Sequence, residues 1–107
     1  MIKRTIVQTR PNTSVQFVNI MSADQTLVSQ EVKSYITDNY ITTNKVSFEN
    51  GVVSEDGLTF TIVKMWANQE AINEYYADPY IVENLISIRI GFLATNSISS
   101  IINDEVI

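Results

Sequence analysis

Apolar and polar residues alternate along several stretches of the chain, and a period of two is typical of β-strands that bury one face. The alternation is clear over residues 3–9, 46–53 and 58–67. A further apolar stretch over residues 97–103 predicts the last strand, after which residues 104–107 trail off. The pattern therefore predicts four strands spread along the whole chain.

The long strand 58–67 is joined to the strand before it by a short turn. Glu55-Asp56-Gly57 is the better hairpin signal, because Leu58 then opens the alternating stretch. Asn50-Gly51 lies inside the preceding strand and predicts a bulge, where one extra residue interrupts the pairing.

A helix is predicted between the first two strands, because apolar residues recur there at spacings of three and four. Ser22 and Gln25 have the spacing of a capping box, in which each side chain binds a free backbone N–H near the helix start. We expect this helix to begin after Ser22 and to close at residues 39–44. Its buried stripe is Val28, Val32, Tyr35, Ile36 and Tyr40.

A second helical region follows the long strand. Asn68 is a good N-cap, and Asp78-Pro79 restarts the helix with a cap followed by proline at the first helical position. Residues 86–92 fit a helix or a strand. We prefer the helix, because a strand would leave only a short crossover after the long strand.

The predicted order of elements is β-α-β-β-α-β, which is the ferredoxin-like plan of the α+β class. It places an antiparallel four-stranded sheet under two helices on one face. At 107 residues, the chain is expected to form a single domain over residues 1–107.

Strand 58–67 is apolar on both of its faces. Phe60 and Ile62 lie on one side, and Val63 and Met65 lie on the other. Whichever face the helices cover, large apolar groups stay on the open side, and charged residues make up only 18% of the chain. We therefore predict a homodimer with these four residues at its seam.

Composition removes several classes of function. The net charge is −5 and the seven Lys and Arg residues are scattered, which argues against a nucleic-acid partner. Cysteine and histidine are absent, so we expect no disulfide, no metal, no haem and no other cofactor. With no apolar run of membrane-spanning or signal-peptide length, we predict a cytoplasmic protein without a membrane partner.

The segment from Trp66 onward resembles the dimeric α/β-barrel superfamily, in particular its antibiotic-biosynthesis-monooxygenase-like members. The matching residues are Trp66, Glu70-Ala71, Tyr75 and Pro79-Tyr80. The resemblance implies two ferredoxin-like subunits packed sheet to sheet, each with a cleft between its sheet and its helices. Tyr75 and Tyr80 replace the two histidines of the family pattern, so this chain lacks the family's haem ligand.

A candidate pocket follows from this resemblance and from one residue outside it. Family members without a cofactor oxidise aromatic substrates, and Trp66, Asn68, Tyr75 and Tyr80 could imitate their polar and aromatic set. Tyrosine is a poor base near neutral pH, since its unperturbed pKa is about 10. Arg89 lies in an apolar segment, and it either pairs with a carboxylate across the dimer or reaches a ligand pocket.

Two functions remain open at this stage. The first is a non-catalytic homodimer that serves as a binding or assembly module. The second is a cofactor-free monooxygenase or isomerase acting on a small aromatic ligand near Trp66. The sequence does not identify a substrate, and we favour the first function because the two usual proton-handling positions carry phenols.

Overall fold

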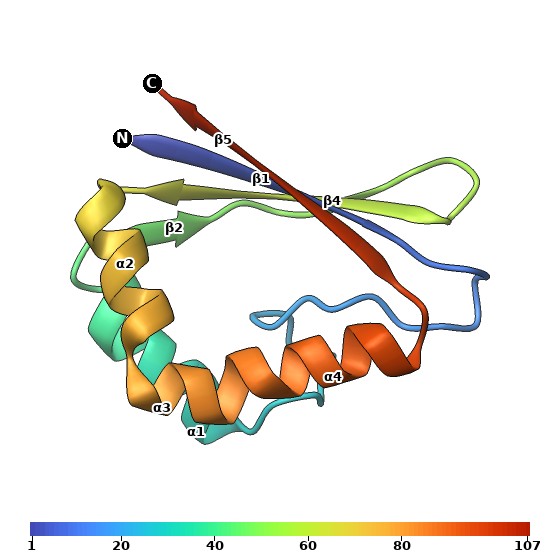
Figure 1. Cartoon of the computed structure of the whole chain (residues 1–107), viewed down its shortest axis with the longest axis horizontal. Coiled ribbons are helices and arrows are strands. Elements are labelled where there is room, and N and C mark those ends of the chain that lie inside the picture. Colours follow the sequence, from blue (N-terminus) through green and yellow to red (C-terminus); the bar gives the residue numbers. More distant parts are fainter.

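The computed structural model describes all residues, 1–107. Its five strands form one antiparallel sheet in the order β2-β4-β1-β5, and the short β3 pairs with β4 (Figure 1). Long strands β1 and β4 occupy the centre, as in the predicted ferredoxin-like plan. The strands are β1 (Ile2–Thr9), β2 (Val46–Phe48), β3 (Val52–Val53), β4 (Thr59–Trp66) and β5 (Ser99–Val106).

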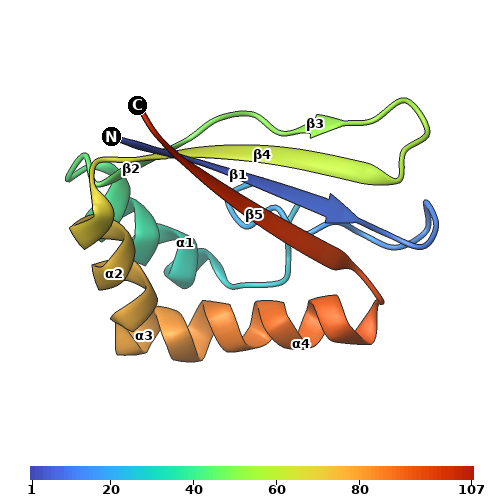
Figure 2. The same cartoon turned by 45° about the horizontal axis from the view of Figure 1, so that its top comes forward.

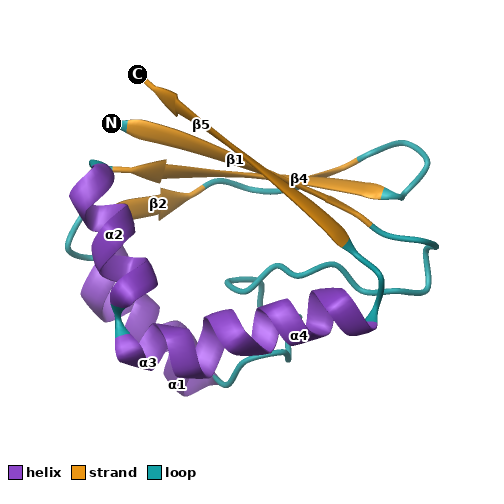
Figure 3. Cartoon of the chain, viewed as in Figure 1, coloured by secondary structure: helices purple, strands orange, loops and turns teal.

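The helices all lie against one face of the sheet and leave the other face open (Figure 2). Two π-helical segments lie among the α-helices, and the four helical pieces between β4 and β5 follow one another along a bent path (Figure 3). The helical pieces are α1 (Gln30–Ile36) with the π-segment Thr37–Ile41, then α2 (Gln69–Ala77), α3 (Pro79–Ile81), the π-segment Val82–Ile86 and α4 (Ser87–Thr95). The β-α-β-β-α-β order and the helix over residues 86–92 are thus confirmed. None of these helices has the length and apolar character needed to cross a membrane.

The core lies between the helices and the inner face of the sheet. Ile36, Trp66 and Ile81 are 0% exposed, and Tyr40 is 2% exposed. The Trp66 ring meets the Tyr75 ring edge-on, with 5.2 Å between their centroids. Aromatic burial of this kind supplies much of the hydrophobic stabilisation in a small domain.

Side chains of β4 alternate between the two faces as the sequence predicts. Thr59 to Trp66 are intermediate and buried in strict alternation. Phe60 and Ile62 are buried on the inner face, under the helices, whereas Val63 and Met65 lie on the open face. The predicted seam is therefore corrected: Phe60 and Ile62 belong to the core of one chain, and only Val63 and Met65 remain available to a second copy.

The first helix begins later than predicted. Ser29 caps it, with its hydroxyl accepting from the Val32 N–H, and the helix starts at Gln30. The Gln25 side chain does not complete a capping box, because its Oε1 accepts from the Asn19 N–H at 2.6 Å. The Lys33 ammonium then donates to the carbonyls at both ends of the expected box, Ser22 and Gln25. Tertiary hydrogen bonds thus hold residues 22–25 in turns.

The hairpin before β4 forms where the sequence predicts it. Gly57 has φ +76°, a conformation that favours glycine, and its N–H donates to the Ser54 carbonyl. The pairing of β4 shifts by one residue between Phe48–Lys64 and Val52–Thr61, so one extra residue lies in the opposing strand. This is the predicted bulge.

The last strand is longer than predicted and is shifted toward the C-terminus. It runs from Ser99 to Val106 and pairs with β1 along its full length. Residues 104–106 are paired because β1 offers a partner for each of them, and the Arg4 guanidinium forms an ion pair with Asp104 at 2.8 Å. The expectation that the chain trails off from Asp104 was wrong.

Candidate functional site

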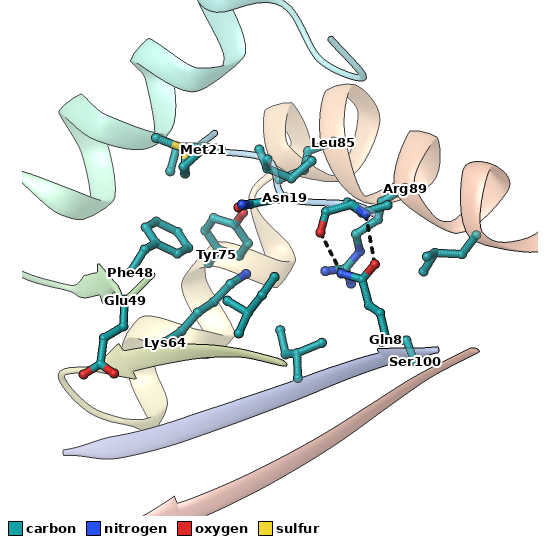
Figure 4. Close-up of a pocket in the computed structure, with 16 residues that line it drawn as sticks. Gln8, Asn19, Met21, Phe48, Glu49, Lys64, Tyr75, Leu85, Arg89 and Ser100 are labelled. Atoms are coloured by element: carbon teal, nitrogen blue, oxygen red, sulfur yellow. Dashed lines mark hydrogen bonds between the residues drawn. The ribbon is translucent and has the colours of Figure 1, made fainter. Parts of the chain in front are cut away.

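A partly open cavity lies between the inner face of the sheet and the helical layer. Its volume is about 50 Å³. The central strands form its floor, α4 forms its roof, and the loop between β1 and α1 closes one side (Figure 4). Ten of its sixteen lining residues are hydrophobic, and the six others are Gln8, Asn19, Glu49, Lys64, Arg89 and Ser100.

Lys64 enters this cavity from β4. It occupies the inner face between Ile62 and Trp66 and is 9% exposed, yet its ammonium makes no hydrogen bond and no ion pair. The nearest aromatic ring is that of Phe48, whose centroid is 5.1 Å from the ammonium nitrogen. Burial lowers the pKa of Lys64 to about 7, and the positive charges of Arg89 and Arg4 act in the same direction.

Arg89 enters from the opposite wall. Its side chain extends from α4 toward the sheet, and its buried Nε–H has no hydrogen-bond partner (Figure 4). Figure 4 shows the Glu49 carboxylate pointing away from the cavity. The Arg4 guanidinium is already paired with Asp104. Lys64 and Arg89 therefore share one cavity without an acidic side chain to balance them.

The loop over the cavity is tied to the sheet by Gln8. This side chain is 4% exposed, and its amide binds the Val18 backbone twice: Nε2 donates to the carbonyl at 2.6 Å, and Oε1 accepts from the N–H at 2.9 Å. The backbone of this loop is not paired with a strand at Val18, and the Gln8 amide satisfies its N–H and its C=O instead. Gln8 therefore fixes the loop over the cavity and uses its own amide to do so, so it offers no partner to Lys64 or Arg89.

The residues of the predicted pocket do not all meet. Tyr75 and Arg89 line the cavity. Trp66 is fully buried behind Tyr75 and does not reach it. Asn68 caps α2, with its Oδ1 accepting from the Ala71 N–H at 2.8 Å, and the Tyr80 ring stacks on Tyr35 with 4.0 Å between centroids. The candidate set is thus divided between the cavity, the core and the helix ends.

Lys64 is the functional candidate that the sequence reasoning missed. The alternation of β4 places a lysine on the same face as Phe60, Ile62 and Trp66, which are all buried. A lysine in phase with such residues is rarely buried without a partner. A lysine at a buried position of β4 was therefore the feature of the sequence that could have identified this candidate.

Tyr75 is unsuited to act as a base in this cavity. Burial raises its pKa, and the neighbouring Tyr76 adds to the effect. The phenol therefore stays protonated across the physiological range. No three histidine, cysteine or carboxylate side chains come together in a group that could hold a metal ion.

Asp78 organises the tyrosines on the helical side of the molecule. Its Oδ2 accepts from the Tyr40 hydroxyl at 2.7 Å and from the Tyr35 hydroxyl at 2.8 Å, and its Oδ1 caps α3 by accepting from the Tyr80 N–H. Burial tends to raise the pKa of Asp78, but the hydrogen bonds from the two hydroxyls outweigh it and lower the pKa. This cluster joins α1, its π-segment and α3, so its role is structural.

We expect Asp78→Ala to lower the free energy of unfolding by about 2 kcal/mol, because it removes a helix cap and the acceptor of two hydroxyl groups. Asp78→Asn keeps an oxygen for the cap and should lose less than half as much. Urea unfolding followed by circular dichroism measures both. Equal losses in the two variants would show that the carboxylate charge, rather than the cap, carries the effect.

Comparisons with known proteins give little beyond the fold. No family model matches the chain, and no curated protein matches it in sequence. Among solved structures, a provisionally assigned antibiotic biosynthesis monooxygenase from Deinococcus radiodurans is similar at 16% identity and a TM-score of 0.48, over 100% of this chain and 92% of that one. Rv0793 from Mycobacterium tuberculosis is similar at 11% identity and a TM-score of 0.44, over 100% and 97%.

Proposed function

We propose that this protein is a non-catalytic binding module that works as a homodimer, joined through the open face of its sheet. The observation that carries the proposal is the chemistry of that face. Val7, Val63 and Met65 lie on it beside Ile101 and Val52, which are 61% and 67% exposed. An apolar strip of this kind on a sheet face is typical of a surface that packs against another protein.

The charges on this face are compatible with a second copy of the same chain. Along β1, β4 and β5, the outward positions carry two charged residues, Lys3 and Glu105. These two are direct partners in the register of β1 and β5, so their charges offset each other within one sheet. The remaining polar positions are mostly threonine and serine. Two identical faces can then meet across a twofold axis without like-charge repulsion at their centre.

Val63→Glu tests this interface. A carboxylate in the middle of the face would be buried twice in a symmetric dimer, and we expect self-association to weaken by roughly 100-fold or more. Light scattering after size exclusion, at low micromolar concentration, gives the mass of the assembly. Val63→Thr is the matched control, because it keeps the size and β-branching and should remain dimeric.

The expected masses are a dimer for the unmodified protein and for Val63→Thr, and a folded monomer for Val63→Glu. A monomeric unmodified protein at this concentration would overturn the proposed homodimer. Ile62→Glu is unsuited to this test, since Ile62 is 8% exposed in the core and a charge there would unfold the chain.

The alternative, a cofactor-free monooxygenase or isomerase acting on a small aromatic substrate near Trp66, has less support. Trp66 is fully buried, and the cavity of about 50 Å³ is too small for an aromatic substrate, since pockets for drug-sized ligands begin at roughly 300 Å³. Tyr75, the phenol that lines the cavity, has a raised pKa, so it keeps its proton and does not act as a base. These features argue against the oxidation of an aromatic substrate at this place.

A further inference from the structure

The unpaired cations of the cavity call for an explanation. A buried charge without a partner is costly, and proteins normally supply an acidic side chain for it. This chain has twelve acidic residues, and elsewhere it uses them in that way, since Asp104 pairs with Arg4 and Glu74 pairs with Lys45. Lys64, which is 9% exposed, and the half-buried Arg89, whose Nε–H is fully buried, receive no such partner. An anion from outside the chain would complete the site.

The two side chains are placed so that one small group could contact both. Lys64 comes from the floor and Arg89 from the roof, and both point into the same space (Figure 4). An ammonium and a guanidinium together bind a carboxylate well, because each donates charge-assisted hydrogen bonds. The rest of the lining is mostly isoleucine, leucine and other apolar side chains, which would pack against a short hydrocarbon part.

We propose that this cavity binds a short-chain organic acid, with its carboxylate between Lys64 and Arg89 and its apolar part against the apolar lining. The size of the cavity, about 50 Å³, restricts the ligand to an acid of about two carbon atoms, such as acetate. The inference rests on the proposed binding role, which it makes specific. It does not rest on the dimer, because all of the lining residues belong to one chain.

The binding should strengthen as the pH falls. Lys64 has a pKa of about 7, so it is largely neutral at pH 9 and largely charged at pH 6. The groups that face it come from four directions. Arg89 comes from α4, and Arg4 comes from β1, where its hydrogen bonds with Asp104 raise its pKa. Tyr75 from α2 stays neutral, and the Glu49 carboxylate just after β2 points away (Figure 4). A bound carboxylate favours the charged form of Lys64, so affinity should rise by up to about tenfold per pH unit between roughly pH 9 and pH 7.

The experiment is a calorimetric titration of the full chain with sodium acetate, butyrate and inorganic phosphate at about pH 6 and about pH 9. We expect saturable acetate binding to the unmodified protein, tighter at the lower pH, and weaker binding of the longer butyrate. Lys64→Met and Arg89→Gln should each weaken acetate binding by roughly tenfold or more, since each removes a charged donor. Lys45→Met, which removes a partly exposed lysine outside the cavity, is the matched control and should bind as the unmodified protein does.

Three results would overturn the inference: no saturable binding of acetate, acetate binding that survives both cavity substitutions, or phosphate binding tighter than acetate binding. Circular dichroism verifies that each variant is folded, and Arg89→Gln carries the test if Lys64→Met does not fold. The mass of the assembly is measured on the same samples. An unmodified protein that is dimeric but does not bind acetate would reject the ligand alone, whereas a monomer that binds acetate would reject only the dimer.

Discussion

Lys64→Met should stabilise the protein at neutral pH, by on the order of 3 kcal/mol. The substitution keeps the length and apolar stem of the side chain and removes a charge that burial disfavours. The pKa of Lys64 falls from 10.5 to about 7 in the folded chain, and each pKa unit corresponds to about 1.36 kcal/mol. A charged lysine at this position therefore opposes folding by a few kcal/mol.

The lowered pKa of Lys64 also determines how the free energy of unfolding depends on pH. Because the folded pKa lies below the unfolded value, the unfolded chain binds more protons between about pH 7 and about pH 10.5. The stability of the unmodified protein should therefore rise with pH across this window, through the contribution of Lys64. In Lys64→Met that contribution is absent, so the gain over the unmodified protein should be largest at and below about pH 7 and should shrink as the pH rises.

Urea unfolding at three pH values between about 6 and about 9.5 measures this prediction. Lys45→Met is the control, since Lys45 is partly exposed in an ion pair with the exposed Glu74 and its loss should change stability by less than about 1 kcal/mol. If Lys64→Met were less stable than the unmodified protein at pH 6, the ammonium would have a compensating partner, and both this prediction and the ligand site would fail.

Trp66→Ala should destabilise the protein by about 3–5 kcal/mol. Trp66 is 0% exposed at the end of β4, and its ring lies against Tyr75 and Tyr76, with centroid distances of 5.2 and 6.4 Å. Removing the ring leaves a large cavity beneath α2 that neighbouring side chains cannot fill completely. A loss of this size is a large share of the stability of a domain of about 100 residues.

Trp66→Phe is the matched control for this substitution. It keeps an aromatic ring in contact with Tyr75 and removes an indole Nε1–H that is buried without a partner. The two effects oppose each other, so we expect a change of about 1 kcal/mol or less. Urea unfolding measures both variants, and neither should change the mass of the assembly because Trp66 lies away from the open face. A loss below about 1 kcal/mol in Trp66→Ala would contradict its place in the core.

The sequence determined the elements whose signals are local. Asn68 caps α2, Asp78-Pro79 restarts the helix, and the turn before β4 closes at Gly57, all as predicted. Each of these depends on hydrogen bonds or dihedral angles within a few residues, so neighbouring positions in the chain carry the information. The strict alternation of β4 likewise fixed which side chains share a face.

Tertiary structure decided the features that depend on distant partners. The Ser22–Gln25 capping box failed because Asn19 and Lys33 compete for its polar groups, and β5 reached Val106 because β1 extends alongside it. The alternation of β4 could not say which of its faces the helices cover, and so it could not separate the core residue Ile62 from the outward Val63.

The cavity also depends partly on what the local sequence determines and partly on tertiary packing. From the sequence, Arg89 could be identified as a cation in an apolar segment, and Lys64 stood in phase with buried residues, but they are 25 positions apart on different elements. Only the packing of α4 over β4 brings both charges into one space without an acidic partner. Sequence periodicity records the direction of each side chain from its own strand or helix, whereas a site depends on the distance between side chains on different elements, which the packing of the fold sets.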